Sequence, residues 1–372
     1  MSSLSKLLEG VVGKKSPDAI VGVDIGSAFI KAAQIHKKGG KAVLDTYGEI
    51  ALGPLQELEV GQATQLSIDK IAEATIDLMN EAKITSRDVV ISLPLTSTLL
   101  TVIEMPDLGE AKLKEMIPIE ARKYIPTAVS EVSLNWWVIP KIQQTYIDPD
   151  EAEKMKQQGP KVDVLLAAVH NDVIERYKQI AQKIGATSAS FEIEIFSAIR
   201  MAIGYDTALS MIVDMGAQNT KVIIVENGVV RSSHLINAGS QDITLALARA
   251  RQSSVLDAEE LKREYGLSGK PDDPTIAEVE RIAVERIVSE VSRIYMKYDR
   301  DKHLAIGQIY LTGGGALLKG IVELFGATFP QSKVSLVRSF SKVEAPAVLT
   351  GLLDDAGPEF AVALGLAFRK LN

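Results

Sequence analysis

The chain of 372 residues is long enough for two domains of ordinary size or for one large composite, and its 46% of hydrophobic residues can form a substantial core. Lys and Arg number 41 against 48 Asp and Glu, and this formal net charge of −7 gives no electrostatic case for nucleic-acid binding. The sequence contains no cysteine, which excludes disulfides, thiol catalysis and cysteine metal sites.

The first elements in chain order are three strands, a helix and a strand. A leader at residues 1–17 precedes them, and its apolar spacing fits a short membrane or partner helix as well as a loosely packed terminus. The alternating run "VGVDIGSAFIKAAQI" predicts a β-hairpin, and "KAVLDTYGEIAL", a helix at about 66–82 and the strand "DVVISLP" follow it. This order is typical of a ribonuclease-H-like nucleotide-binding domain. Without a signal peptide or a long uncharged apolar run, we expect a cytoplasmic protein.

The segment at about 95–165 has a different character and predicts a small inserted subdomain. It contains the strands "STLLTVIEMP", "VSLNWWVIP" and "KVDVLLAAVH", a helix with Pro118 inside it, and a polar, charged loop at 148–160. Trp136 and Trp137 are adjacent on a strand and therefore point to opposite faces. We expect one of the two to be exposed or to lie at an interface.

The opening pattern recurs in the second half of the chain. After helices at about 171–185 and 195–204, the stretch "LSMIVDMGAQNTKVIIVENGVVRSSHLI" repeats the V-D-x-G turn and a lysine seven residues after the aspartate. This internal repeat predicts two related lobes with a ligand in the cleft between them. The remaining predicted elements are helices at about 240–251, 257–265 and 275–299, a strand with three glycines and a helix, and an apolar helix at 359–371 that returns to the first lobe.

The two V-D-x-G hairpins are candidate phosphate-binding turns. Gly26 and Gly216 let the backbone approach a phosphate without a Cβ in the way. Asp24 and Asp214, facing each other across the cleft, can hold a hydrated Mg²⁺ that bridges phosphate oxygens. The candidate hydrogen-bonding side chains for the phosphates are Ser27, Lys31, Asn219 and Thr220. The alternative is two ordinary hairpins whose aspartates satisfy their own turns.

A third candidate element is the stretch "LTGGGALL". Gly313, Gly314 and Gly315 end a buried strand and open a helix. This arrangement permits close packing of a flat ring and hydrogen bonding from the helix N-terminus.

The three motifs in this order resemble the phosphate loops and the adenosine loop of the actin-like ATPase superfamily, and the resemblance covers nearly the whole chain. It implies ATP as cofactor together with Mg²⁺, and it adds Gly239 to the cofactor-binding positions. "AEELKREYG" is similar to the family helix whose glutamate and lysine contact the adenosine, here Glu259 and Lys262. The alternative for this pair is an ordinary i,i+3 contact on a solvated face.

The resemblance also implies one catalytic position. Glu194 is similar to the glutamate that orients the attacking water in bacterial actins. Ile195 replaces the usual proline, and Lys221 stands where an acidic or small residue is common. We therefore expect at most slow ATPase activity.

The inserted subdomain resembles that of FtsA, and "IPIEARKYIP", "VSLNWWVIP" and the closing "EFAVALGLAFRKL" resemble the PilM family of type IV pilus assembly. The resemblance implies an α/β, actin-like (ribonuclease-H-like) two-lobed fold with an FtsA-type inserted small α/β subdomain. Four parts are expected: a leader at 1–17, a first lobe at 18–94 completed by 359–372, the partner-binding insertion at 95–165, and a second lobe with a nucleotide-binding helical subdomain at 166–358.

The PilM resemblance further implies a scaffold that links the membrane alignment complex to the cytoplasmic motor. Its partner would be the N-terminal cytoplasmic peptide of a PilN-like inner-membrane protein, which would also bring the chain to the inner membrane. Pilus motor ATPases and a second copy of the chain are further candidate partners, and nucleic acid is not. Candidate side chains for the peptide groove are Met116, Ile119, Tyr124, Ile125, Leu95, Leu99 and Leu100, each of which also fits a place in the subdomain core.

Three other functions are weighed against the pilus scaffold. A filament-forming, FtsA-like cell-division protein would carry a C-terminal amphipathic helix, which this sequence lacks after 359–371. A metabolic kinase needs a second catalytic group beside Glu194. A type II secretion protein with a degenerate nucleotide site does not fit the intact Asp24, Asp214 and glycine triplet.

Overall fold

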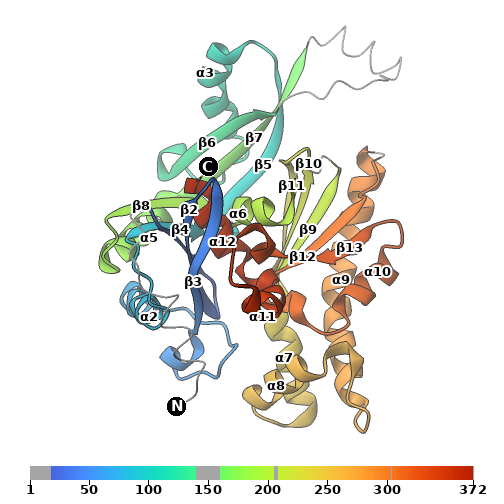
Figure 1. Ribbon diagram of the computed structural model, residues 1–372. Helices are drawn as coiled ribbons and strands as arrows, with labels where there is room; N and C mark the ends of the chain where they lie inside the picture. The colour runs from blue at the N-terminus through green and yellow to red at the C-terminus, as the bar shows by residue number, and fades with distance from the viewer. Residues whose placement is uncertain (1–17, 140–159, 205–207, 303, 372) are drawn as a thin grey trace.

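Two five-stranded sheets with the same topology form the body of the molecule (Figure 1). The computed structural model describes residues 18–139, 160–204, 208–302 and 304–371. The first sheet has the order β3-β2-β1-β4-β8, with β1 Ile20–Ile25, β2 Phe29–Lys38, β3 Lys41–Ala51, β4 Asp88–Leu93 and β8 Ser188–Ile193. The second has the order β11-β10-β9-β12-β13, with β9 Ser210–Met215, β10 Thr220–Glu226, β11 Val229–Ile236, β12 Gln308–Thr312 and β13 Lys333–Leu336.

The two sheets are copies of one strand pattern. In each, the first three strands along the chain pair antiparallel, and the next two join parallel beside the first strand. The central strands β1 and β9 are buried on both faces for most of their length, which is why they read as apolar runs. The internal repeat predicted from the V-D-x-G pattern is therefore present in the fold.

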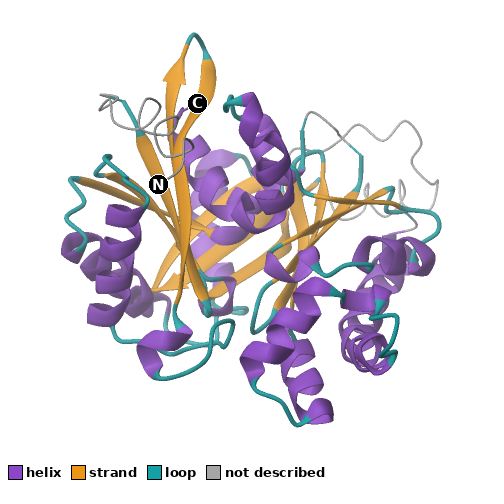
Figure 2. Ribbon diagram, turned by 60° about the horizontal axis from the view of Figure 1, so that its bottom comes forward, coloured by secondary structure: helices purple, strands orange, loops and turns teal. Residues whose placement is uncertain are grey.

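Helices cover both sheets and also fill the space between them (Figure 2). In the first lobe, α2 Ile68–Glu81 and α5 Asn171–Lys183 pack in one core with β1 and β4. In the second lobe, α9 Thr275–Lys302 and α10 Ile321–Thr328 pack against β9 and β12, and α7 Ser240–Arg251 and α8 Val255–Glu264 lie beside them. Leu353 of α11 Thr350–Ala356 instead shares a core with residues of β1 and β2.

Two further helices join the lobes to each other. The buried faces of α6 Glu194–Ala202 and α12 Ala361–Leu371 pack together and against β1 and β2. Ile195 and Ile199 of α6 also share a core with Ile212 and Ile223 of the second sheet. Because α12 is covered on nearly all sides, its sequence is almost entirely apolar.

The inserted subdomain is a separate sheet with its own core. Its order is β5-β7-β6, from β5 Thr98–Pro106, β6 Val132–Ile139 and β7 Lys161–His170, and α3 Glu110–Ala121 packs on one face. Trp136 points into this core, whereas Trp137 is 50% exposed, as their alternation predicts. In Figure 1 this subdomain lies at the top of the view, above the first lobe.

The predicted boundary between insertion and second lobe is wrong in one respect. The chain was expected to enter the second lobe at residue 166, but β8 pairs in parallel with β4 in the first sheet. After the insertion, the chain thus returns through α5 and β8 to the first lobe, and it enters the second lobe only at β9. The residues of this short strand do not themselves indicate which sheet it joins.

The predicted leader at 1–17 and most of the polar loop at 148–160 lie outside the described residues. Among the residues that the structure describes, no helix has the length and the apolar character needed to cross a bilayer.

Candidate functional site

The turns of the two repeated hairpins have the same hydrogen bonding. The Gly26 N–H donates to the Phe29 carbonyl at 3.0 Å, and the Gly216 N–H donates to the Asn219 carbonyl at 3.0 Å. Each aspartate is the cross-strand partner of the lysine seven residues later, Asp24 of Lys31 and Asp214 of Lys221. The sequence repeat therefore extends to single backbone contacts.

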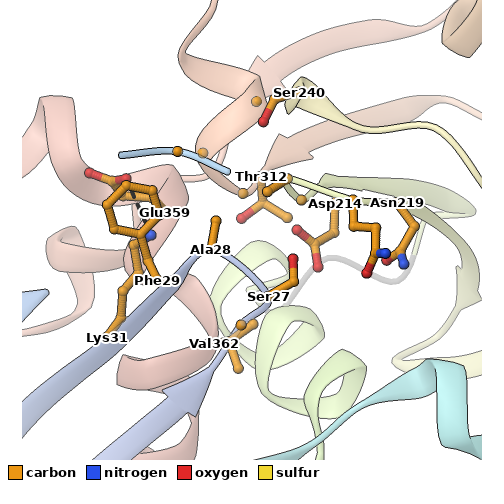
Figure 3. Close-up of a pocket in the computed structure, with 18 of the residues that line it drawn as sticks. Ser27, Ala28, Phe29, Lys31, Asp214, Asn219, Ser240, Thr312, Glu359 and Val362 are labelled. Atoms are coloured by element: carbon orange, nitrogen blue, oxygen red, sulfur yellow. Dashed lines mark ion pairs between the residues drawn. The ribbon is translucent and has the colours of Figure 1, made fainter. Parts of the chain in front are cut away.

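A cavity of about 420 Å³ lies between these turns (Figure 3). Its wall contains thirteen of the fifteen predicted site residues: Asp24, Gly26, Ser27, Lys31, Glu194, Asp214, Gly216, Asn219, Glu259, Lys262, Gly313, Gly314 and Gly315. The close-up shows Ser27 from one turn and Asp214 and Asn219 from the other lying around the same space. The sequence thus predicted the residues that both lobes contribute to one cavity.

Two predicted residues do not line the cavity. Thr220 is fully buried, and its hydroxyl donates to the Ala238 carbonyl at 2.8 Å. Gly239 packs against the backbone of Ala217 and precedes α7, so that Ser240 lines the cavity in its place. The strand and the helix cap give these two residues other partners, and their phosphate contact stays a prediction.

Sequence reasoning missed Glu359, which reaches the cavity from the segment before α12. Its carboxylate lies 3.5 Å from Lys31 Nζ, and Glu49 lies 3.2 Å from the same atom. Burial raises the pKa of Glu359, although Lys31 acts against this effect. No local sequence signal marks this residue, because only the return of the chain end to the first lobe brings it to the site.

The glycine triplet allows the adenosine-loop candidate to pack tightly against the second hairpin. Gly313 has a φ of 82°, and a Cβ on it would lie 2.5 Å from Asp214 Oδ1. The Gly313 N–H and the Thr312 hydroxyl both donate to the Pro358 carbonyl, at 2.9 and 2.6 Å. A residue other than glycine at 313 would therefore push the loop away from Asp214.

The end of the cavity where the sequence predicts an adenosine contact contains a buried ion pair. Lys262 Nζ lies 2.6 Å from Glu259 Oε2, and Thr244 bonds to both side chains. Burial opposes the ionised form of Glu259, but Lys262, Thr244 and Arg263 hold its pKa below the usual value. Both members of the pair are less than a tenth exposed, so the alternative of a solvated surface pair is wrong.

At the other end, Lys221 lies among three carboxylates. Its Nζ is 2.6 Å from Glu194 Oε2 and 3.1 Å from Asp214 Oδ2. Burial opposes the charged ammonium, but Asp214, Glu194 and Asp24 raise the pKa of Lys221 above its usual value. Burial raises the pKa of Asp24 against the effect of Lys221.

The predicted Mg²⁺ between Asp24 and Asp214 fits this arrangement poorly. Asp214 Oδ2 is held by Lys221, and Asp24 Oδ1 accepts a hydrogen bond from Ser92 at 2.8 Å. Within the described ranges, no group of three or more His, Cys, Asp or Glu side chains is placed to hold a metal ion. We therefore derive no step through a metal at this position, and Mg²⁺ stays a prediction.

A family model described as type IV pilus assembly protein PilM matches residues 22–371. The chain belongs to this family. It is similar to the solved structure of a PilM–PilN type IV pilus biogenesis complex, with a TM-score of 0.77, 24% identity, and coverage of 95% of this chain and 98% of that chain. The structure of ethanolamine utilization protein EutJ from Carboxydothermus hydrogenoformans has a TM-score of 0.55 at 15% identity, over 97% of this chain and 93% of that chain.

Among curated proteins, the cell division protein FtsA of Helicobacter pylori is 24% identical over 247 residues. That alignment covers 59% of this chain and 49% of FtsA, so the chain matches about half the length of this relative. The structural likenesses confirm the actin-like, two-lobed α/β fold predicted from the sequence.

Proposed function

We propose that the chain is an ATP-binding scaffold of type IV pilus assembly, cytoplasmic and held at the inner membrane through a PilN-like partner. The family match over residues 22–371 carries the pilus assignment. The cavity between the two repeated hairpins supports the proposal of nucleotide binding. Both lobes contribute a hairpin turn and lysines to its wall, and the first residue of α7 also lines it. We also propose that the chain couples the membrane alignment complex to the cytoplasmic motor ATPases.

We propose that the partner peptide binds a second cavity, of about 670 Å³, at the base of the inserted subdomain. β6 forms one wall, α6 and β8 of the first lobe form another, and the turn between β10 and β11 reaches the same space. The rings of Trp137 and Phe196 lie 5.8 Å apart across the junction of subdomain and lobe. This apolar junction suits the side chains of an extended peptide.

The edge of the subdomain sheet supports the same site. β6 is the outer strand of the order β5-β7-β6 in the described part of the chain, and Ser133, Asn135 and Trp137 along it line the cavity. An added peptide strand can pair with such an edge through its main chain while alternate side chains enter the groove. The side chains predicted from the sequence lie elsewhere: Leu95, Leu100 and Ile125 are buried, and Ile119 and Tyr124 are exposed outside this cavity.

Calorimetry tests the partner proposal with a synthetic peptide of the N-terminal cytoplasmic residues of a PilN-like inner-membrane protein. We expect one peptide per chain. Trp137→Ala should weaken peptide binding more than about tenfold, because the exposed half of the indole ring can no longer contact the peptide. Tyr124→Ala is the matched control, since Tyr124 is an exposed aromatic residue of the same subdomain outside the cavity. Equal affinities for the two variants would contradict the assignment of the groove.

The FtsA-like alternative has weaker support, because that similarity covers only part of both chains. It predicts ATP-dependent filaments that sediment without any peptide.

A further inference from the structure

The two equivalent lysines of the repeat have different surroundings. Lys31 of the first hairpin turns to Glu49 and Glu359, at 3.2 and 3.5 Å, and its Nζ lies 5.0 Å from the centre of the Phe29 ring. Lys221 of the second hairpin instead lies between Glu194 and Asp214. The same position in the repeat therefore serves two different electrostatic roles.

Lys221 occupies the centre of the carboxylate cluster. Lys221, Glu194 and Asp214 are 9%, 8% and 5% exposed, so water screens their charges little. Both oxygens of Glu194 are used, one by Lys221 and the other by the Leu95 N–H at 2.7 Å. A divalent cation at this place would have to displace the ammonium or lie beside it, and both arrangements are unfavourable in a site of low polarity.

The cluster needs a cation when a phosphate chain enters. Carboxylates outnumber cationic side chains along the cavity wall, and Lys262 is already paired with Glu259 at the opposite end. At the end formed by Asp24, Glu194 and Asp214, Lys221 is the ammonium group that lines the cavity. Its three donors can contact a phosphate oxygen and a carboxylate at the same time.

We propose that Lys221 is the resident cation of this cleft: it takes the place of a divalent metal ion between the aspartates and binds the phosphate chain directly, so that the nucleotide binds without an obligatory metal. The inference rests on the proposed nucleotide site and adds the chemistry by which that site neutralises phosphate. It differs from the Mg²⁺ bridge that the paired aspartates alone predict.

The first experiment measures ATP affinity of the full chain by calorimetry, with excess Mg²⁺ and with EDTA. For the parent we expect the two dissociation constants to differ by less than about tenfold, and for Lys221→Met we expect their ratio to grow by more than about tenfold. Lys31→Met is the matched control from the equivalent position of the repeat. It should weaken ATP binding in both conditions and leave the ratio as in the parent. A parent that binds ATP only with Mg²⁺ would overturn the inference.

The second experiment uses Mn²⁺ alone, without nucleotide, and follows the free ion by electron paramagnetic resonance. We expect no stoichiometric binding by the parent and one Mn²⁺ per chain in Lys221→Met, whose three carboxylates are then without their ammonium. Stoichiometric Mn²⁺ binding by the parent would overturn the inference even if Lys221→Met does not fold. If the parent binds no ATP in either condition, the proposed nucleotide site fails, and the Mn²⁺ result alone decides on Lys221.

Discussion

At the residue scale, Glu280 is a buried acid without a hydrogen-bond partner among the described residues. It lies on α9 with its side chain fully buried, and both carboxylate oxygens are unsatisfied. Burial raises its pKa from 4.5 to about 8, although the nearby Lys262 acts in the opposite direction. The folded chain therefore binds a proton at this residue more tightly than the unfolded chain does.

The raised pKa of Glu280 predicts how the stability of the fold depends on pH. Because the pKa is higher in the folded chain than in the unfolded chain, the stabilisation from the protonated Glu280 is fully present below pH 4.5. It is lost as the pH rises through about 8. Glu280→Gln should remove this loss, which amounts to about 1.4 kcal/mol for each unit of pKa displacement, and the variant should be more stable than the parent at pH 8. Urea unfolding across this pH range measures the effect.

The control for this prediction is Glu285→Gln, an exposed glutamate on the same helix. It should keep the pH dependence of the parent. If Glu280→Gln keeps that dependence as well, the buried carboxyl is not the group responsible.

At the element scale, α12 packs so closely on the first lobe that two positions require glycine. A Cβ on Gly22 of β1 would lie 1.9 Å from the Ala363 carbonyl oxygen, and one on Gly365 would lie 2.2 Å from the Ser197 carbonyl oxygen of α6. The helix therefore contacts the backbone of a strand and of a second helix directly. This contact fixes the chain end that brings Glu359 to the cavity.

Gly22→Ala should lower the free energy of unfolding by about 1–3 kcal/mol or more, because α12 must move away from β1. Gly351→Ala is the matched control on α11. A Cβ there meets open space, and alanine in a helix should stabilise by about 0.5–1 kcal/mol. Denaturant unfolding of both variants measures the difference. A Gly22→Ala chain as stable as the parent would contradict the close packing of α12.

The sequence predicted local patterns well, and it predicted contacts between distant elements poorly. The V-D-x-G hairpins and the glycine triplet were found because each is a short run with its own backbone requirement. The contact of Lys221 with Glu194 could not be predicted, since Glu194 comes from α6, outside the hairpin. The place of β8 in the first sheet and the arrival of Glu359 at the site likewise depend on tertiary packing.

At the scale of the whole molecule, the two copies of one topology meet at a single cavity. Ser27 and Glu359 enter it with the first lobe, whereas Asn219, Ser240 and Gly314 enter it with the second. A nucleotide bound there would contact both lobes at once and thereby favour one spacing between them. The inserted subdomain meets both lobes at the second cavity, so the proposed peptide site borders the same interface.

The most direct test of the account is a calorimetric titration of ATP into the full chain and into Gly314→Phe. Gly314 faces the cavity, and the nearest atom to a Cβ there is 3.8 Å away, so the new ring can fill the site without disturbing the fold. We expect one ATP per parent chain and binding weakened more than about a hundredfold in the variant. No binding by the parent, or equal binding by a folded Gly314→Phe chain, would contradict the claim that the cleft between the hairpins binds nucleotide.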